Sequence, residues 1–150
     1  MNKLKTFDDL SVHELYQILK LRSEVFVLEQ ECLYQDMDGK DQQCHHLMMF
    51  EDGELAAYTR LLPAGVSFAE ASIGRVVVHP EFRGRGLARK LMKQSVAHCY
   101  ELFGKQPVRI GAQYYLKDFY SSIGFEQQGD IYLEDGIEHI EMLLTDALNT

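Results

Sequence analysis

The segment HPEFRGRGLARKLM, residues 79–92, places two glycines between arginines just before an apparent helix. The first N–H groups of a helix have no intrahelical partner and carry partial positive charge, so a helix N-terminus is suited to anions. Gly84 and Gly86 would let an anion approach the backbone closely, and Arg83 and Arg85 would add charge-assisted hydrogen bonds. We therefore expect a phosphate or pyrophosphate site at this segment.

Two common nucleotide-binding motifs do not fit this segment. Arg89 occupies the third glycine position of a dinucleotide fingerprint, and the Gly-Lys-Ser/Thr sequence of a P-loop does not follow. A solvated surface turn is the plainer alternative, because short glycine motifs are weak signals on their own. The rest of the sequence has to distinguish an anion site from such a turn.

The N-terminal part of the chain predicts a helix followed by a polar loop. Ser11 and Glu14 have the spacing of a capping box, which starts a helix whose apolar side is expected to include Val12 and Tyr16. Residues 35–43, QDMDGKDQQ, are expected to form an exposed loop that contributes to specificity.

Turn residues place the remaining elements. Asp52-Gly53 and Asp135-Gly136 predict tight β-hairpins, and a β-branched run that ends at Pro80 predicts a strand directly before the glycine segment. The expected order is one strand, a helix, three strands, a helix, a strand, a helix and two strands. This order is typical of an α/β (α+β) domain with a mixed sheet.

Composition indicates one folded domain over residues 1–150. Hydrophobic residues make up 46% and charged residues 25%, as in soluble globular proteins. No apolar run approaches the roughly 18 residues of a membrane helix, the N-terminus resembles no signal peptide, and the three cysteines are widely spaced. We expect a cytoplasmic protein with no membrane partner. The net charge of −8 also disfavours nucleic acid as the main partner.

A metal site is not expected. Cys44, His45 and His46 are consecutive on an expected strand, where neighbouring side chains point to opposite faces and do not converge on one ion. Cys99 falls on the apolar stripe of the helix after the glycine segment, which indicates core packing.

In its context the sequence RGRGLA, residues 83–88, resembles the Q/R-x-x-G-x-G/A acetyl-coenzyme A (acetyl-CoA) signature of the GNAT superfamily of N-acetyltransferases. It follows a strand that ends in VVVHP, as in that family. The segment AQYYLKDFYSSIGF, residues 112–125, is similar to the family's second cofactor motif. LRSEVFVLEQ, YQDMDGKD and DGIEHIEM resemble the ElaA subgroup, so the resemblance covers nearly the whole chain.

The resemblance implies a GNAT-like single domain, with helices beside a mixed β-sheet that is splayed at its centre to admit acetyl-CoA. Pantetheine would bind the backbone of the splayed strand and the pyrophosphate would lie over the glycine segment. Gln113 falls where many members have an asparagine next to the cofactor. The implied cofactor-binding positions are Val76, Val77, Val78, Arg83, Gly84, Arg85, Gly86, Leu87, Ala88, Arg89 and Gln113.

The resemblance also implies direct attack of a primary amine on acetyl-CoA. Tyr120 matches the tyrosine that protonates the departing thiolate, and a phenol with a pKa near 10 is protonated at pH 7 and can do so. The amine must first lose its proton. Candidates for the base are His139, Glu29 and His79, of which His139 is favoured because histidine titrates near neutral pH.

Other functions and partners follow from the same residues. The acceptor is expected to be a small-molecule or peptide amine, and the last hairpin could supply a homodimer contact. A non-catalytic CoA-binding or sensing module is the alternative function. An RGRG-type nucleic-acid binder is disfavoured, because a single short basic cluster lies in an acidic chain.

Overall fold

The protein is described by a computed structural model over residues 1–145. The described strands form two sheets, in the orders β1-β2-β3-β4 and β5-β7-β6, and each ladder is antiparallel. The first sheet comprises β1 (Asn2–Thr6), β2 (His45–Glu51), β3 (Glu54–Leu62) and β4 (Ser72–Val78). The second comprises β5 (Val108–Gln113), β6 (Glu126–Glu134) and β7 (Ile137–Leu144). The helices are α1 (Val12–Arg22), α2 (Leu87–Phe103) and α3 (Lys117–Ile123), so the predicted order of elements is confirmed.

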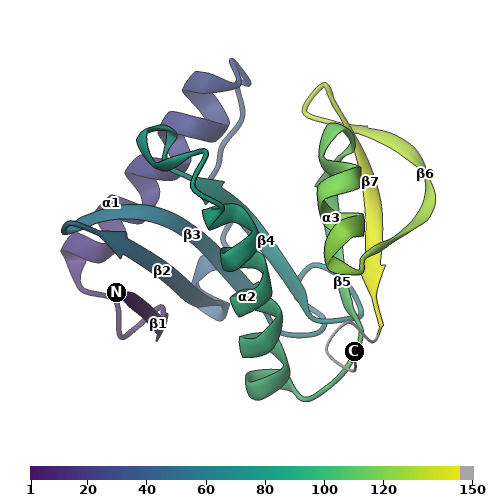
Figure 1. Ribbon diagram of the computed structural model, residues 1–150, viewed down its shortest axis with the longest axis horizontal. Helices are drawn as coiled ribbons and strands as arrows, with labels where there is room; N and C mark the ends of the chain where they lie inside the picture. Colours follow the sequence, from purple (N-terminus) through teal and green to yellow (C-terminus); the bar gives the residue numbers. More distant parts are fainter. Residues whose placement is uncertain (146–150) are drawn as a thin grey trace.

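The two sheets meet at the start of β4 and β5 and then separate. Ala71 and Val108 form an isolated parallel bridge, in which the N–H of Arg109 donates to the carbonyl of Ala71 at 3.0 Å. Figure 1 shows the sheets opening away from this junction, with α2 over the first sheet and α3 over the second. The predicted mixed, centrally splayed sheet is therefore confirmed.

Helices α1 and α2 cover opposite faces of the first sheet. Met48 of β2 packs in the cluster that contains Ile18 of α1, whereas its neighbours Leu47 and Met49 pack with Leu91 of α2. This follows from the alternation of side chains along a strand. Because both faces are covered, β2 and β3 are buried over most of their length, without alternation between buried and exposed residues.

The local signals for caps and turns are confirmed. The hydroxyl of Ser11 accepts from the N–H of Glu14 at 3.0 Å, and the Glu14 carboxylate accepts from the N–H of Ser11 at 2.9 Å. Both hairpins turn through the expected Asp-Gly pairs, in which both residues have positive φ: Asp52, Gly53, Asp135 and Gly136.

The expected apolar face of α1 is wrong in the first half of the helix, whereas Leu21 near its end is buried as expected. Val12 is 78% exposed and Tyr16 is 72% exposed, whereas the helix buries the charged residues Glu14 and Arg22. Glu14 forms an ion pair with Lys5, and Arg22 forms one with Asp36. Both partners lie outside the helix, so the hydrophobic periodicity of the helix does not predict that these charges are buried. The helix continues as a π-helical segment over Ser23–Glu29.

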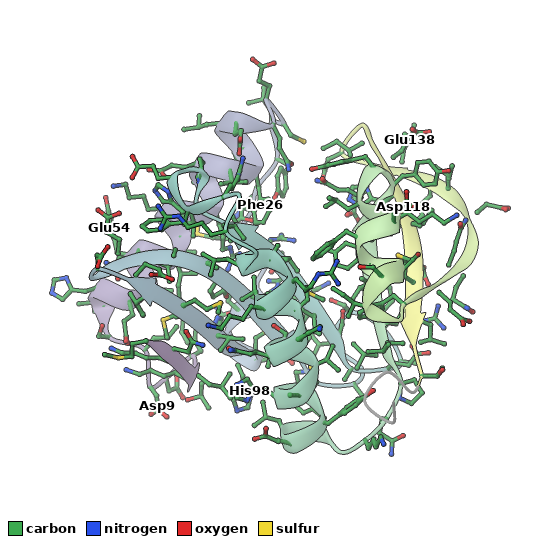
Figure 2. All side chains as sticks on the ribbon, viewed as in Figure 1. Asp9, Phe26, Glu54, His98, Asp118 and Glu138 are labelled. Atoms are coloured by element: carbon green, nitrogen blue, oxygen red, sulfur yellow. The ribbon has the colours of Figure 1, made fainter. Side chains whose placement is uncertain are left out.

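The outer surface carries charged side chains and a few apolar ones. Figure 2 shows Asp9, Glu54 and Glu138 at the periphery of the molecule. Ile131 and Leu133, on the edge strand β6, are 43% and 72% exposed, so the homodimer contact proposed for the last hairpin stays a prediction. Among residues 1–145, no helix has the length and apolar content to span a membrane.

Candidate active site

A cleft of about 1150 Å³ lies where β4 and β5 separate. One wall is formed by β4 and the segment after α1, and the other by β5, α3 and the β6–β7 hairpin. Several of the candidate residues line this one cleft: Val76, Val77, Val78, Arg83, Gln113, Tyr120 and His139. The chain thus brings together side chains from both halves of the splayed sheet.

Strand β4 presents an unpaired backbone edge to the cleft. One edge of β4 pairs with β3. Beyond the bridge at Ala71, no strand among the described residues pairs with the edge of β4 that faces the cleft. The side chains of Val76 and Val78 pack toward α2, and Val77 packs toward α1. Because the side chains are held in the core, the backbone N–H and C=O groups are left to pair with an extended ligand.

A β-bulge interrupts β4 within the cleft. Tyr58 of β3 pairs with Val77, whereas Arg60 pairs with Gly74, so β4 has one extra residue between these pairs. Arg75 lies in this bulge with φ 51°, a left-handed conformation that costs an L-residue about 1–2 kcal/mol. Such strain persists only where the surroundings hold it, and it is concentrated at functional sites.

The glycine segment forms an open turn in front of α2. Gly84 and Gly86 have φ of 81° and 75°, and a Cβ at either position would meet no atom within 4 Å. These positions therefore require glycine for backbone conformation, and the space in front of them is free. No side chain caps the N-terminus of α2, so its first N–H groups are available to an anion.

The arginines near this turn have different surroundings. Arg85 lies over the ring of Phe82 at 5.1 Å and is exposed, and Arg89 donates to the hydroxyl of Ser122 on α3 at 2.9 Å. Leu87 is buried in the core with Phe82. The turn, Arg85 and Arg89 lie outside the wall of the large cleft; Gly86 and Arg89 border a smaller basic hollow of about 320 Å³.

Arg83 is already paired. Its two terminal nitrogens donate to the carboxylate of Glu29 at 2.6 and 2.7 Å, and its Nε donates to the carbonyl of Val78 at 3.2 Å. The hydrogen bond from Arg83 lowers the pKa of Glu29. Glu29 lines the cleft, but as a carboxylate bound to arginine it is a weak proton acceptor.

Tyr120 reaches the cleft from α3. It is 5% exposed, with its ring edge-to-face against Phe119 and Phe125. Burial, and secondarily the neighbouring Tyr115, raises the pKa of Tyr120 above its ordinary value, so the phenol keeps its proton. No hydrogen bond within residues 1–145 occupies its hydroxyl, which leaves the proton available to a ligand.

His139 lies on β7 between Gln113 of β5 and Tyr132 of β6. Its Nδ1 is 2.8 Å from the carbonyl of Ile137, which only accepts, so Nδ1 carries the proton and Nε2 of the neutral ring is an acceptor. The Nε2 of His139 is 3.6 Å from the carboxylate of Glu134. This carboxylate stabilises the ring once it has taken up a proton.

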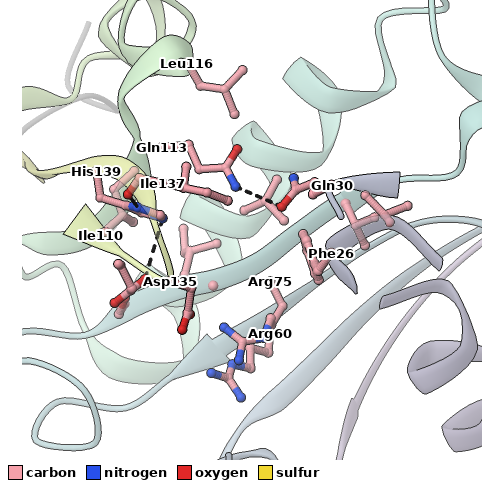
Figure 3. A pocket seen from close by; sticks show the side chains of 18 of the residues that line it. Phe26, Gln30, Arg60, Arg75, Ile110, Gln113, Leu116, Asp135, Ile137 and His139 are labelled. Atoms are coloured by element: carbon pink, nitrogen blue, oxygen red, sulfur yellow. Dashed lines mark hydrogen bonds and ion pairs between the residues drawn. The ribbon is translucent and has the colours of Figure 1, made fainter. Parts of the chain in front are cut away.

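The other polar candidates have structural partners. The amide of Gln113 donates to the Oε1 of Gln30 at 3.2 Å and so connects the two walls (Figure 3). His79 accepts from the N–H of Glu81 at 3.1 Å and does not line the cleft. This position is a poor one for a base that acts there.

Cys44, His45 and His46 have separate partners. The thiol of Cys44 donates to the carbonyl of Lys40, His45 lies edge-on to Phe103, and His46 hydrogen-bonds to Tyr58 and to the carbonyl of Asp41. Within residues 1–145 no cluster of three or more metal-ligating side chains occurs.

Residues 35–43 form a mostly exposed segment, as expected, but two of its aspartates are buried. Asp36 and Asp41 are 8% and 6% exposed, because they form ion pairs with Arg22 and Arg60, which are buried. Burial by itself would raise the pKa of Asp41, but the hydrogen bond from Arg22 and the nearby charges lower it.

This charge network extends into the cleft. Asp38 binds Arg60 at 2.6 Å, and Asp36 binds Arg75 of the β4 bulge at 2.8 Å. Arg60 and Arg75 line the cleft wall (Figure 3), as does Asp38. The three aspartates of residues 35–43 were the signal in the sequence for a charge network. Their arginine partners lie on α1, β3 and β4, so the spacing of the aspartates alone did not reveal the ion pairs.

Comparison with known proteins agrees with this geometry. A family model described as an acetyltransferase (GNAT) domain matches residues 5–145. The chain is 41% identical to the protein ElaA of Escherichia coli over 136 residues, 89% of each chain, and 44% identical to a UPF0039 protein of Schizosaccharomyces pombe over 142 residues, 93% of each chain. A crystal structure of an acyl-CoA N-acyltransferase from Pseudomonas aeruginosa superposes with a TM-score of 0.91 at 42% identity, covering 96% of this chain and 98% of that one. The structure of E. coli ElaA gives 0.90 at 38% identity over the same shares.

Proposed function

Because the chain belongs to the GNAT family of acetyl-CoA-dependent acyltransferases and is ElaA-like, we propose that it transfers the acetyl group of acetyl-CoA to a primary amine by direct attack. The acceptor is a small-molecule or peptide amine. No covalent enzyme intermediate is required, because the edge of β4, Tyr120 and His139 line one cleft of about 1150 Å³, in which the amine and the thioester can meet directly.

The free edge of β4 and the turn before α2 are the proposed acetyl-CoA site. Val76, Val77 and Val78 offer backbone groups to pantetheine, and an N–H near Val77 polarises the thioester carbonyl. The open turn and the uncapped helix N-terminus accept the pyrophosphate, with Arg85 and Arg89 as cations beside it. Arg83 acts mainly through Glu29, by bracing the end of β4 against the π-helical segment.

The acceptor amine has to be neutral when it attacks. An amine with a pKa of about 10.4 is neutral in only about one molecule in 2,500 at pH 7. His139 is the proposed base because its Nε2 is an acceptor in the cleft and Glu134 stabilises the charged ring that results. The nitrogen then attacks the carbonyl carbon, the bond from that carbon to sulfur breaks, and the nitrogen loses its second proton. This proton and the one held by His139 are released to solvent.

Tyr120 is the proposed acid that protonates the departing thiolate. Burial keeps its hydroxyl protonated, and this hydroxyl has no partner within residues 1–145 that would compete for the proton. A phenol can donate to a thiolate whose conjugate acid has a pKa near 8.5. The thiol leaves as coenzyme A, and a proton from solvent restores Tyr120.

One observation carries the proposal: an unpaired strand edge, a protonated tyrosine and an acceptor nitrogen of histidine line the same cleft. The direct test is an acceptor screen that measures thiol release from acetyl-CoA with a broad panel of amines. Acetyl-dependent thiol release with at least one amine is expected. Acetyl-CoA binding with no release across the panel would favour a non-catalytic CoA-binding module instead.

A further inference from the structure

Asp36 connects three separate parts of the chain through its carboxylate. Its Oδ2 accepts from Nε of Arg22 at 2.8 Å, and its Oδ1 accepts from Nε of Arg75 at 2.8 Å and from the hydroxyl of Tyr34 at 3.3 Å. Its main-chain carbonyl also accepts from Arg22 and Arg75, at 3.3 and 2.9 Å. Every oxygen of this one residue therefore binds a neighbour.

Arg22, one of these neighbours, is held firmly in place. Arg22 is fully buried on α1, and its Nη1 donates to Asp41 at 2.8 Å. A buried guanidinium with two carboxylate partners has little freedom to move. Asp36 is consequently held in place by the helix rather than by its own loop.

Arg75, the other neighbour, has a strained backbone conformation that its surroundings must maintain. Arg75 has φ 51° in the β4 bulge, and the β3–β4 ladder passes from Gly74 to Val77 without pairing Arg75 or Val76. Hydrogen bonds of the ladder therefore do not fix this conformation, whereas the side-chain contacts of Arg75 with Asp36 do.

We propose that Asp36 is a positioning residue for acetyl transfer: it holds Arg75, and through it the β4 bulge, in the conformation that directs the β4 backbone at the thioester carbonyl. The inference rests on the proposed function, because it assigns a role within that cleft. Tyr34 and Asp38 line the same cleft, so the network joins this part of the cleft wall to the bulge.

The test uses Arg75→Gln, which removes the charge and the Nε donor but keeps a side chain of similar length. Arg109→Gln is the matched control, because Arg109 is 20% exposed where Arg75 is 22% exposed, and each arginine binds two carboxylates. Arg109 does not line the cleft. Asp36→Asn tests the partner, and Arg75→Lys is the conservative variant, which also serves if Arg75→Gln does not fold.

We expect Arg75→Gln and Asp36→Asn to lower kcat by about 10- to 100-fold, because misplacing a reacting group by about 1 Å has an effect of this size. The Kd for acetyl-CoA should change by less than about threefold, since pyrophosphate and pantetheine contacts remain. Arg75→Lys should recover part of the kcat, and Arg109→Gln should keep the wild-type value. An unchanged kcat in Arg75→Gln, or an equal loss in Arg109→Gln, would overturn the proposal.

A second readout needs no acceptor amine. The infrared band of the ¹³C-labelled acetyl carbonyl in bound acetyl-CoA should be displaced from its position in solution in the wild type, and should return toward it in Arg75→Gln. If no amine supports thiol release but the band behaves in this way, the transferase function fails and the positioning role stands. If release occurs and the band is the same in both proteins, the positioning role fails.

Discussion

Arg83 and Glu29 are 54 residues apart in the sequence and form a bidentate ion pair at the cleft, with N···O distances of 2.6 and 2.7 Å. The pair joins the end of β4 to the π-helical segment that follows α1. It also removes Glu29 from the candidates for the base, because Arg83 lowers the pKa of its carboxyl. His139 remains the base candidate within the cleft.

Matched substitutions distinguish these two residues. His139→Gln should lower kcat at pH 7 by about 100-fold or more, the usual contribution of a general base. Glu29→Gln should change it by less than about fivefold, since an exposed ion pair contributes at most about 1 kcal/mol. The defect of His139→Gln should shrink as the pH rises toward the pKa of the free amine. Steady-state rates between pH 6 and 10 would check this, and a larger loss in Glu29→Gln would reverse the assignment.

Tyr120→Phe should separate turnover from binding. The ring keeps its packing against Phe119 and Phe125, and the lost hydroxyl has no partner among residues 1–145, so the melting temperature should stay close to that of the wild type. The value of kcat should fall by about 100-fold or more, with the Kd for acetyl-CoA nearly unchanged. Stopped-flow thiol release and calorimetric binding measure the two quantities. Equal losses in both would contradict the role of acid.

Gly84→Ala should weaken acetyl-CoA binding beyond its effect on stability. Alanine at φ 81° is strained by about 1–2 kcal/mol, and its Cβ enters the open space in front of the turn. Gly53→Ala is the control, because Gly53 has φ 79° and similarly open space but lies in the β2–β3 hairpin. Both variants should lose similar stability in urea, whereas Gly84→Ala alone should raise the Kd by about tenfold. The same Kd change in both would show that the turn does not hold the phosphates.

Glu14 predicts how stability depends on acid. Burial opposes its charge, but the N–H of Ser11 and the ammonium groups of Lys5 and Lys3 lower its pKa to about 2. A carboxyl whose pKa is lowered by folding stabilises the protein above its unfolded pKa of about 4.5, and this stability is lost as the pH falls toward 2.

Glu14→Gln should therefore lower the free energy of unfolding by about 1–2 kcal/mol at pH 7. This value allows for solvent screening of the ion pairs, because Lys3 and Lys5 are partly exposed. The difference between the two proteins should diminish between pH 4.5 and 2. Urea denaturation at several pH values would measure it. A difference that is constant over this range would mean that packing rather than charge accounts for the effect.

Sequence reasoning was most successful where local signals determine the structure. The capping box, both Asp-Gly hairpins and the glycine turn at Gly84 and Gly86 depend on residues within a few positions of one another. The donor side of the candidate site depends on the same kind of signal, because a strand, a turn and a helix follow directly along the chain.

The charge network around Asp36 depends on pairs that are distant in the sequence. Asp36 in an isolated polar segment reads as solvated, because nothing near it indicates that Arg22 and Arg75 will enclose it. The exposed face of α1 was missed for the same reason, since buried charges pair across elements while periodicity describes one element at a time.

The bridge between Ala71 and Val108 is the one backbone pairing between the two sheets among residues 1–145, so the two halves of the cleft can change separately. Most of the proposed acetyl-CoA positions lie on β4, in the glycine turn and on α2, whereas Gln113, Tyr120 and His139 follow Val108 in the chain. Substitutions around His139 can therefore change the surroundings of the amine without altering the edge of β4 or the glycine turn. A lineage with this architecture can diversify its acceptors without rebuilding its donor site.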